Sequence, residues 1–282
     1  MSGAGGDDVV VEVTLGRPGD RQSSLAQALE QTLAVARRAV VRTLRQRALI
    51  IFPMIFPLIL FAINGSALNP ATRIPGFPTH NYRDFLIAMP FVQGAMFVSI
   101  SAGVDLAKDI ESGFLNRLAL TPLRGETLLV GQLGGALVIG IIQAIVYLLV
   151  GLASGVALAS GFGGAIVLLL LSILIGFAFA SLGELLALRF GTGEAVQSIF
   201  PLLFVTLFLS SSSLPRNLIS VTWFRDVATY NPVSYLLEGL RSLVITGWDG
   251  QALALGFGFS LLILVVALAL SRSAMKTRLA RR

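Results

Sequence analysis

The chain has 282 residues, of which 55% are hydrophobic and only 13% are charged, whereas about a quarter of the residues of a soluble domain carry charge. It has no cysteine and a single histidine, His80, which excludes disulfides, zinc–thiolate sites and histidine-cluster metal sites. The formal charge of +6 does not indicate nucleic-acid binding, because Lys and Arg beside membrane spans account for it. Composition therefore predicts an integral, all-α membrane protein.

The N-terminal region divides into a tail and a helix. Residues 1–22 are Gly-rich and acidic and lack a long apolar core, so we expect a flexible cytoplasmic tail and no signal peptide. Residues 23–47 are expected to form a basic amphipathic interfacial helix, because apolar side chains recur there every three or four residues. These are Leu25, Leu29, Leu33, Ala36, Val40 and Leu44. The helix either lies in the inner membrane interface or only anchors the topology, and both are compatible.

Residues 48–282 are expected to form a transmembrane domain of six helices. The predicted spans are residues 48–63, 85–104, 128–158, 164–188, 195–211 and 252–271, each near the length that crosses hydrocarbon. The first span contains Pro53 and Pro57, which a membrane helix tolerates only where neighbouring groups or water satisfy the freed carbonyls.

The distribution of positive charge sets the orientation. Sixteen of the 21 Lys and Arg residues lie in segments that are cytoplasmic if the N-terminus is inside. The positive-inside rule therefore predicts that both termini are cytoplasmic. We expect a multi-pass protein of the plasma (inner) membrane.

The connection between the second and third spans is patterned like a structured segment. Leu106, Ile110, Phe114 and Leu118 recur at a four-residue spacing, and Thr121–Pro122 is a typical helix start. We expect two short cytoplasmic helices that meet near Leu120. Ordering such a segment costs about 1–2 kcal/mol per residue, which favours a docking role over a simple linker.

Residues 212–250, on the outer side, are too apolar for an ordinary loop. Asn231–Pro232 is another helix start, Glu238 and Arg241 are spaced to pair, and Gly247 ends the predicted helix. The helix is too short to span, so we expect outer re-entrant helices that dip into the membrane and return.

These two segments carry a resemblance to a known family. The inner pattern E-x-G-x(3)-R-L-x(2)-T-P-x-R runs from Glu111 to Arg124, and the outer pattern N-P-x(2)-Y-x(5)-R runs from Asn231 to Arg241. With the six-span layout, the chain from about residue 24 to its end resembles the permease subunit of type-2 ABC exporters, in the branch of daunorubicin-resistance permeases.

The resemblance implies an assembly and two functional sites. Two permeases, identical or homologous, would pair around a path in the membrane lipid, each bound by an ABC ATPase subunit that carries ATP and Mg. The inner segment would be the coupling helix, with the coupling residues Glu111, Gly113, Arg117, Thr121, Pro122 and Arg124. The outer helices would form a gate, with Asn231, Pro232, Tyr235 and Arg241.

Other features bear on energy supply and cargo. The chain has no G-x-x-x-x-G-K-[ST] phosphate loop, so we expect no ATPase site and no cofactor in it. Side chains that are polar or aromatic in the second and fifth spans either line an amphipathic path or serve helix packing. The path candidates are Gln93, Phe97, Ser101, Phe208 and Ser210. Glu184 either reaches the inner interface near Arg189 or has a structural or pathway role.

The leading hypothesis is an exporter permease for an amphipathic drug, natural product or lipid-like molecule. A permease for lipid-linked polysaccharide would share the same frame. An ion-coupled secondary carrier is disfavoured because no chain of acids or histidines crosses the spans and the two halves show no repeat. An intramembrane enzyme is disfavoured because His80 lies outside the spans and no second acid accompanies Glu184.

Overall fold

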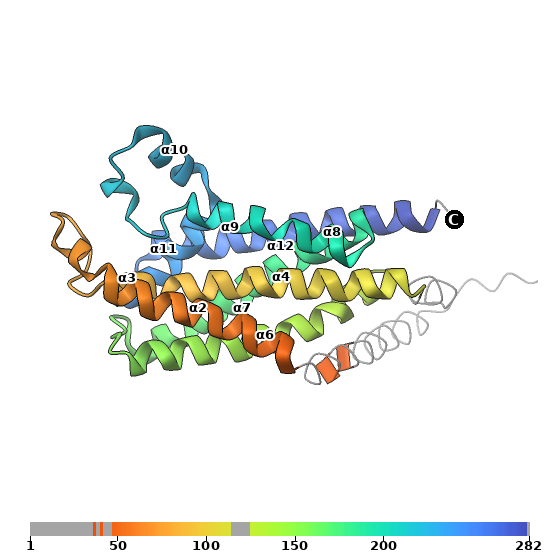
Figure 1. Ribbon diagram of the computed structural model, residues 1–282, viewed down its shortest axis with the longest axis horizontal. Coiled ribbons are helices and arrows are strands. Elements are labelled where there is room, and N and C mark those ends of the chain that lie inside the picture. The colour runs from red at the N-terminus through yellow and green to blue at the C-terminus, as the bar shows by residue number, and fades with distance from the viewer. Residues whose placement is uncertain (1–35, 38–39, 42–46, 114–124, 281–282) are drawn as a thin grey trace, which may run out of the picture.

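The computed structural model describes residues 36–37, 40–41, 47–113 and 125–280, and within these ranges the regular structure is entirely helical. Its long helices are α2 (Arg47–Ala67), α4 (Ala88–Glu111), α6 (Gly125–Ala153), α7 (Gly161–Phe190) and α12 (Gly250–Ala280), and they run along the long axis of the molecule (Figure 1). The shorter helices are η1 (Asn69–Arg73), α3 (Tyr82–Leu86), α8 (Gly193–Ser198), α9 (Phe200–Phe208), η2 (Arg216–Leu218), α10 (Thr222–Tyr230) and α11 (Pro232–Ile245).

Four of the helical segments have the length and apolar composition to cross a membrane: Tyr82–Glu111, Gly131–Ala153, Gly161–Phe190 and Gly250–Arg278. Two further apolar helices, Ile51–Ala67 and Gly193–Phe208, occupy the places of the predicted first and fifth spans but are shorter. The all-α membrane class is thus confirmed, and four spans are supported by length and composition.

The predicted fifth span is wrong as a continuous helix. The chain from 193 to 208 forms two helices, α8 and α9, separated at Ile199. Pro201 lies in the first turn of α9 and has no N–H to donate to the carbonyl four residues earlier. The proline therefore separates the two helices.

Two other boundaries also differ from the prediction. The helix expected to end at residue 104 continues to Glu111, so Leu106 and Ile110 belong to α4 and are buried near its C-terminal end rather than forming a separate loop helix. The helix expected to reach residue 158 ends at Ala153, because Gly155 takes a positive φ of 90° that turns the chain.

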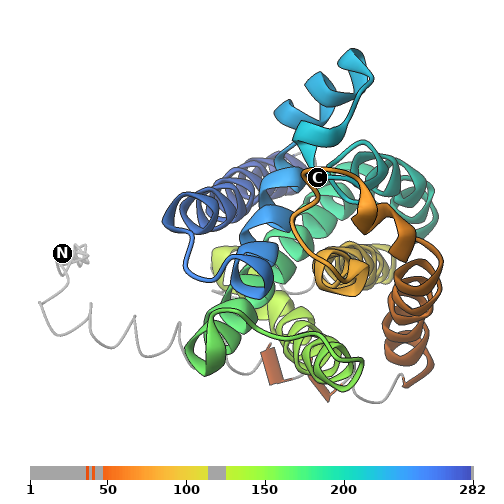
Figure 2. The same cartoon turned by 90° about the vertical axis from the view of Figure 1, so that its left-hand side faces the viewer.

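Helix α7 lies at the centre of the bundle, in contact with α4, α6, α11 and α12 (Figure 2). Its contact with α4 depends on glycine at the crossing. A Cβ added at Gly183 would lie 1.8 Å from the carbonyl oxygen of Ser99, and one added at Gly103 would lie 2.6 Å from the carbonyl oxygen of Gly183. The two backbones thus touch directly, as small residues allow in membrane helices.

One of the two prolines of α2, Pro57, has the compensation that a membrane helix requires. Pro57 has no N–H, so the carbonyl of Pro53 loses its partner within the helix. The hydroxyl of Tyr147 in α6 donates to that carbonyl at 3.3 Å, and Tyr147 is buried against Gly94 of α4. The side chain of one helix therefore satisfies the backbone of another.

The two ends of the bundle differ in structure. α3, α10 and α11 gather at one end, and the C-terminus lies at the opposite end (Figure 1). The core is divided accordingly. One large buried cluster joins α3, α4, α7 and α11, and a smaller one joins the far ends of α4, α7 and α12 with α8.

The predicted interfacial helix and the predicted coupling segment lie mostly outside the described residues. Of the expected interfacial helix at 23–47, the structure describes helical backbone at 36–37, 40–41 and from Arg47. Ala36 lies against α6, where a Cβ added at Gly134 would come within 2.8 Å of its Cβ. Residues 114–124 of the expected coupling segment also lie outside.

Candidate functional site

The candidate site that the sequence predicts for the outer side is built on α11, and the predicted start of this helix is confirmed. Asn231 is the N-cap, and its side-chain oxygen accepts the N–H of Val233 at 2.9 Å, while Pro232 occupies the first turn. The amide nitrogen of Asn231 also donates to the carbonyl of Thr206 in α9 at 2.6 Å. The Asn–Pro pair thus both starts α11 and attaches it to α9.

Arg241 is the most connected of the predicted outer residues. It is 5% exposed, and its guanidinium donates to the carbonyls of Phe85, Ser211 and Ser212 at 2.7, 2.6 and 2.7 Å. The same guanidinium lies 3.6 Å from the ring centroid of Phe85. A buried cation here binds backbone dipoles and an aromatic face, and it joins α11 to α3 and to the segment after α9.

The predicted pairing of Glu238 with Arg241 is wrong. The carboxylate of Glu238 forms an ion pair with Arg216 of η2 and accepts the hydroxyl of Ser211 at 3.2 Å. Arg241 instead points toward the carbonyls of Phe85, Ser211 and Ser212, which lie far from it in sequence and close to it in the fold. Burial lowers the pKa of Arg216, but the charge of Glu238 and the hydrogen bonds of the guanidinium to Tyr235 and Glu238 together raise this pKa overall.

Tyr235 completes these attachments. Its hydroxyl donates to the carbonyl of Thr229 at 2.8 Å, and its ring stacks on Phe259 of α12 with a centroid distance of 4.7 Å. The guanidinium carbon of Arg216 lies 4.6 Å from the centroid of the same Tyr235 ring. Tyr235 therefore links α11 with α10, η2 and α12.

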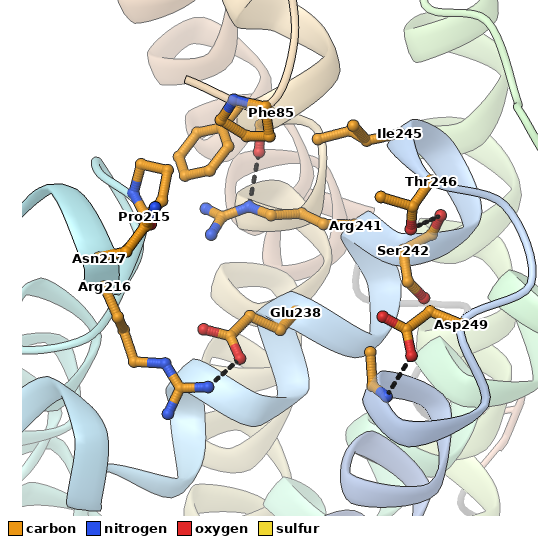
Figure 3. Close-up of a pocket in the computed structure, with 12 residues that line it drawn as sticks. Phe85, Pro215, Arg216, Asn217, Glu238, Arg241, Ser242, Ile245, Thr246 and Asp249 are labelled. Carbon is orange, nitrogen blue, oxygen red and sulfur yellow. Dashed lines mark hydrogen bonds and ion pairs between the residues drawn. The ribbon is translucent and has the colours of Figure 1, made fainter. Parts of the chain in front are cut away.

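Arg216, Glu238 and Arg241, but not Asn231 or Tyr235, line a cavity of about 390 Å³ beside α11 (Figure 3). Arg216 and Glu238 face each other across one side, and Arg241 reaches past the cavity to Phe85. Ser242, Thr246 and Asp249 lie on the other side. The cavity is lined by two cations, Arg216 and Arg241, and by two acids, Glu238 and Asp249, whose charges cancel. It therefore suits a neutral or zwitterionic group better than a strongly charged one.

At the end of the bundle opposite to α11, the structure describes the first of the predicted coupling residues and not the others. Glu111, the last residue of α4, accepts the backbone N–H of Gly193 at 3.0 Å. Gly113 has a φ of 68°, a conformation that L-residues rarely adopt, so it turns the chain directly after α4. Arg117, Thr121, Pro122 and Arg124 lie outside the described residues.

The path candidates are only partly brought together. Phe97 of α4 joins an aromatic cluster with Phe56 of α2 and with Phe200 and Phe204 of α9, at centroid distances of 5.9, 5.0 and 5.7 Å. Phe208 extends this cluster from Phe204 and is half-exposed. The cluster joins three helices on one side of the bundle.

The polar candidates occupy different environments. Gln93 is fully buried and its amide has no hydrogen-bond partner among the described residues, whereas Ser101 is partly exposed. Ser210 lies in the turn after α9, is buried, and donates to the carbonyl of Leu207 in the last turn of α9. These three side chains therefore do not share one surface.

Glu184 does not reach the inner interface near Arg189. Its side chain is 1% exposed within the bundle, and neither carboxyl oxygen has a hydrogen-bond partner among the described residues. The interpretation as an interfacial acid is thus wrong, and a structural or pathway role stays a prediction.

Sequence inspection missed several of these residues. Phe200 and Phe204 carried a usable signal, since with Phe208 they recur every four residues and so share one face of a helix. Tyr147 and Arg216 could not be found from sequence spacing, because their partners, Pro53 and Glu238, lie 94 and 22 residues away along the chain.

An all-helical bundle with several membrane-crossing helices and a compact helical layer at one end defines a polytopic membrane protein. The sequence profile of the ABC-2 type transporter family matches residues 30–245, and the chain belongs to this family.

Named relatives agree with this family. A Streptomyces coeruleorubidus protein, daunorubicin resistance ABC transporter permease protein DrrB1, is 24% identical over 202 residues, covering 70% of this chain and 67% of that protein. Proteins named "Putative transport permease ycf38" are each 26% identical. The one from Cyanophora paradoxa aligns over 217 residues, or 76% of this chain and 74% of its own length. The one from Porphyra purpurea aligns over 229 residues, or 79% and 77%.

Proposed function

We propose that this chain is the membrane subunit of an ATP-driven exporter that moves an amphipathic drug, natural product or lipid-like molecule out of the cytoplasm or inner leaflet. The observation that carries the proposal is the family match over residues 30–245, together with the inner and outer motifs at the two ends of one helical bundle. The daunorubicin-resistance name of one relative supports an amphipathic cargo.

The proposed assembly has two permeases and ABC ATPase subunits that hold ATP and Mg. The side of the bundle formed by α2 and α9 suits the permease contact and the path. It carries the aromatic cluster of Phe56, Phe97, Phe200 and Phe204, and it leaves Phe52 and Leu202 largely exposed. An amphipathic cargo would pass along aromatic surfaces of this kind. The proposed location is the plasma membrane, with both termini cytoplasmic.

Contacts between α4 and α8 provide a route by which a conformational change in an ATPase would reach the membrane helices. The expected coupling segment continues from the end of α4, where the carboxylate of Glu111 accepts the N–H of Gly193, the first residue of α8. α8 continues into α9, which carries Phe200 and Phe204. A displacement of the coupling segment would therefore move α4 and α9 together.

This route is tested by replacing Glu111 with Gln in the complex with its ATPase. The amide accepts the Gly193 N–H more weakly than a carboxylate, so we expect cargo-stimulated ATP hydrolysis and transport to fall by about two- to tenfold. Arg124→Gln tests the part of the motif that the resemblance assigns to the ATPase contact. Glu194→Gln, an exposed acid one residue after Gly193, is the matched control and is expected to change neither rate.

Unchanged transport and stimulated hydrolysis in both Glu111→Gln and Arg124→Gln would contradict the coupling role. Transport of lipid-linked polysaccharide instead of small amphipathic molecules by the reconstituted complex would keep the coupling role and replace the cargo.

A further inference from the structure

A second cavity lies at the end of the bundle opposite to the α11 layer, between the C-terminal ends of α7 and α12. Its volume is about 410 Å³, and Arg189, Phe190, Ser273, Thr277 and Arg278 line it. The carboxyl ends of the two helices come together here because α7 and α12 run in the same direction and pack along their length (Figure 1). The family motifs and the proposed coupling route do not involve it.

The charged side chains of this cavity are all cationic, and their two positive charges exceed the partial negative charge of about half an elementary charge at each helix C-terminus. Two arginines line it, and among the described residues no acidic side chain does. Arg278 donates one N–H to the carbonyl of Leu188 at 2.8 Å, which holds the guanidinium at the mouth of the cavity with its other donors available. Arg189 has no hydrogen-bond or ion-pair partner among the described residues and is exposed. The cavity therefore contains N–H donors of Arg189 and Arg278 that are available to bind an anion.

The residue types favour a phosphate group. Guanidinium groups bind phosphate oxygens through paired N–H donors, and the hydroxyl of Ser273 adds another donor on the same side. Basic pockets between transmembrane helices are typical binding places for anionic lipid headgroups.

The position of Phe190 favours a lipid over a soluble phosphate. Phe190 is 54% exposed at the last residue of α7, directly beside Arg189. An exposed aromatic ring next to cations at the end of a membrane-crossing helix matches the boundary between acyl chains and headgroups. A small soluble phosphate would gain nothing from that ring.

We propose that the cavity between the C-terminal ends of α7 and α12 binds the phosphate of an anionic phospholipid, with Arg189 and Arg278 on the phosphate and Phe190 against the acyl chain. This lipid belongs to the leaflet that this end of the bundle faces, which is the inner leaflet in the proposed orientation. It is a bound lipid that stabilises one end of α7 and α12, separate from any transported cargo.

The test is lipid binding to the purified full chain in detergent, measured by native mass spectrometry with dioctanoyl phosphatidylglycerol. Dioctanoyl phosphatidylcholine serves as the zwitterionic comparison. We expect the wild type to prefer phosphatidylglycerol, and Arg189→Gln and Arg278→Gln each to weaken it about fivefold, as expected for one cation near a headgroup. Arg225→Gln, an exposed arginine of α10, is the matched control and is expected to bind like the wild type.

Two further measurements separate the sources of the anion and guard against misfolding. Phe190→Ser is expected to weaken phosphatidylglycerol, and glycerol 3-phosphate at millimolar concentration is expected not to displace the lipid. Arg278→Gln also removes the bond to Leu188, so its thermal stability is measured in parallel, whereas Arg189→Gln removes no such bond.

Three results would overturn the proposal. The first is equal phosphatidylglycerol binding by wild type, Arg189→Gln and Arg278→Gln. The second is full displacement by glycerol 3-phosphate with no effect of Phe190→Ser, which would assign the cavity to a soluble phosphate. The third is unchanged lipid binding with reduced co-purification of an ATPase, which would assign it to a protein contact.

Discussion

Arg241 shows how one buried side chain can define an arrangement of helices. Three of its N–H donors, one on each guanidinium nitrogen, reach the carbonyls of Phe85, Ser211 and Ser212. Phe85 belongs to α3, and the two serines belong to the segment after α9. A planar guanidinium directs donors from three separate nitrogens in fixed directions, whereas an ammonium group has its donors on a single nitrogen and cannot reach the same three positions at once. The position of α11 relative to α3 and to the end of α9 therefore depends on arginine and not merely on positive charge.

Arg241→Lys is accordingly expected to destabilise the protein by about 2–4 kcal/mol, because it leaves buried carbonyls without donors while keeping the charge. The measurement is the thermal unfolding midpoint of the purified chain in detergent. Arg225→Lys, at an exposed position of α10, is the control and is expected to leave the midpoint unchanged. A midpoint equal to wild type in Arg241→Lys would show that water or other donors satisfy these carbonyls.

Among the helices, α2 and α9 show two outcomes of proline within apolar segments. In α2, Pro57 is accommodated because the hydroxyl of Tyr147 satisfies the carbonyl of Pro53, and the helix continues. In the segment from α8 to α9, Pro201 coincides with a break between two helices. The local sequence places a proline in both segments, and the neighbouring helix decides whether the helix persists.

Tyr147→Phe is expected to destabilise the protein by about 0.5–1.5 kcal/mol, since it removes one hydrogen bond to a buried carbonyl. Pro57→Ala restores an N–H that can satisfy the same carbonyl from within α2. In a double-mutant cycle, Tyr147→Phe should therefore cost less in the Pro57→Ala background than in the wild type. The measurement is the thermal unfolding midpoint of the four proteins. Equal costs in both backgrounds would mean that the Tyr147 hydroxyl does not serve the Pro53 carbonyl.

At the scale of the whole molecule, the two ends of the bundle face different environments. The end with α10 and α11 exposes Trp223, Tyr230 and Trp248, aromatic residues that suit a membrane interface. The opposite end carries Arg189 and Arg278 and the C-terminus. Both ends are thus suited to a membrane interface, and the proposed orientation rests on the distribution of Lys and Arg along the whole sequence.

The orientation can be tested directly, because the chain has no native cysteine to mask a single introduced one. Tyr230→Cys lies on α10, where the native side chain is 86% exposed, and Thr277→Cys lies on an exposed position near the end of α12. A membrane-impermeant maleimide added to intact cells is expected to label Tyr230→Cys and to spare Thr277→Cys until the cells are lysed. The reverse pattern would invert the topology and contradict the coupling role of Glu111.

The sequence by itself determined the properties that depend on short-range patterns. Apolar run length predicted the membrane class and the positions of the long helices, and the Asn231–Pro232 pair predicted the start of α11. Such features are readable because the chemistry that sets them lies within a few residues. The roles of Glu111, Arg241 and the other motif residues came from family resemblance and stay predictions.

Only the tertiary structure decided which side chains meet. It paired Glu238 with Arg216 instead of Arg241, buried Glu184 away from Arg189, and brought Phe97 of α4 against Phe200 of α9. It also brought the ends of α7 and α12 together around a basic cavity. In a bundle of long helices each residue has several neighbours of suitable chemistry, and helix rotation, the glycine crossing of α4 with α7 and the break at Pro201 select among them.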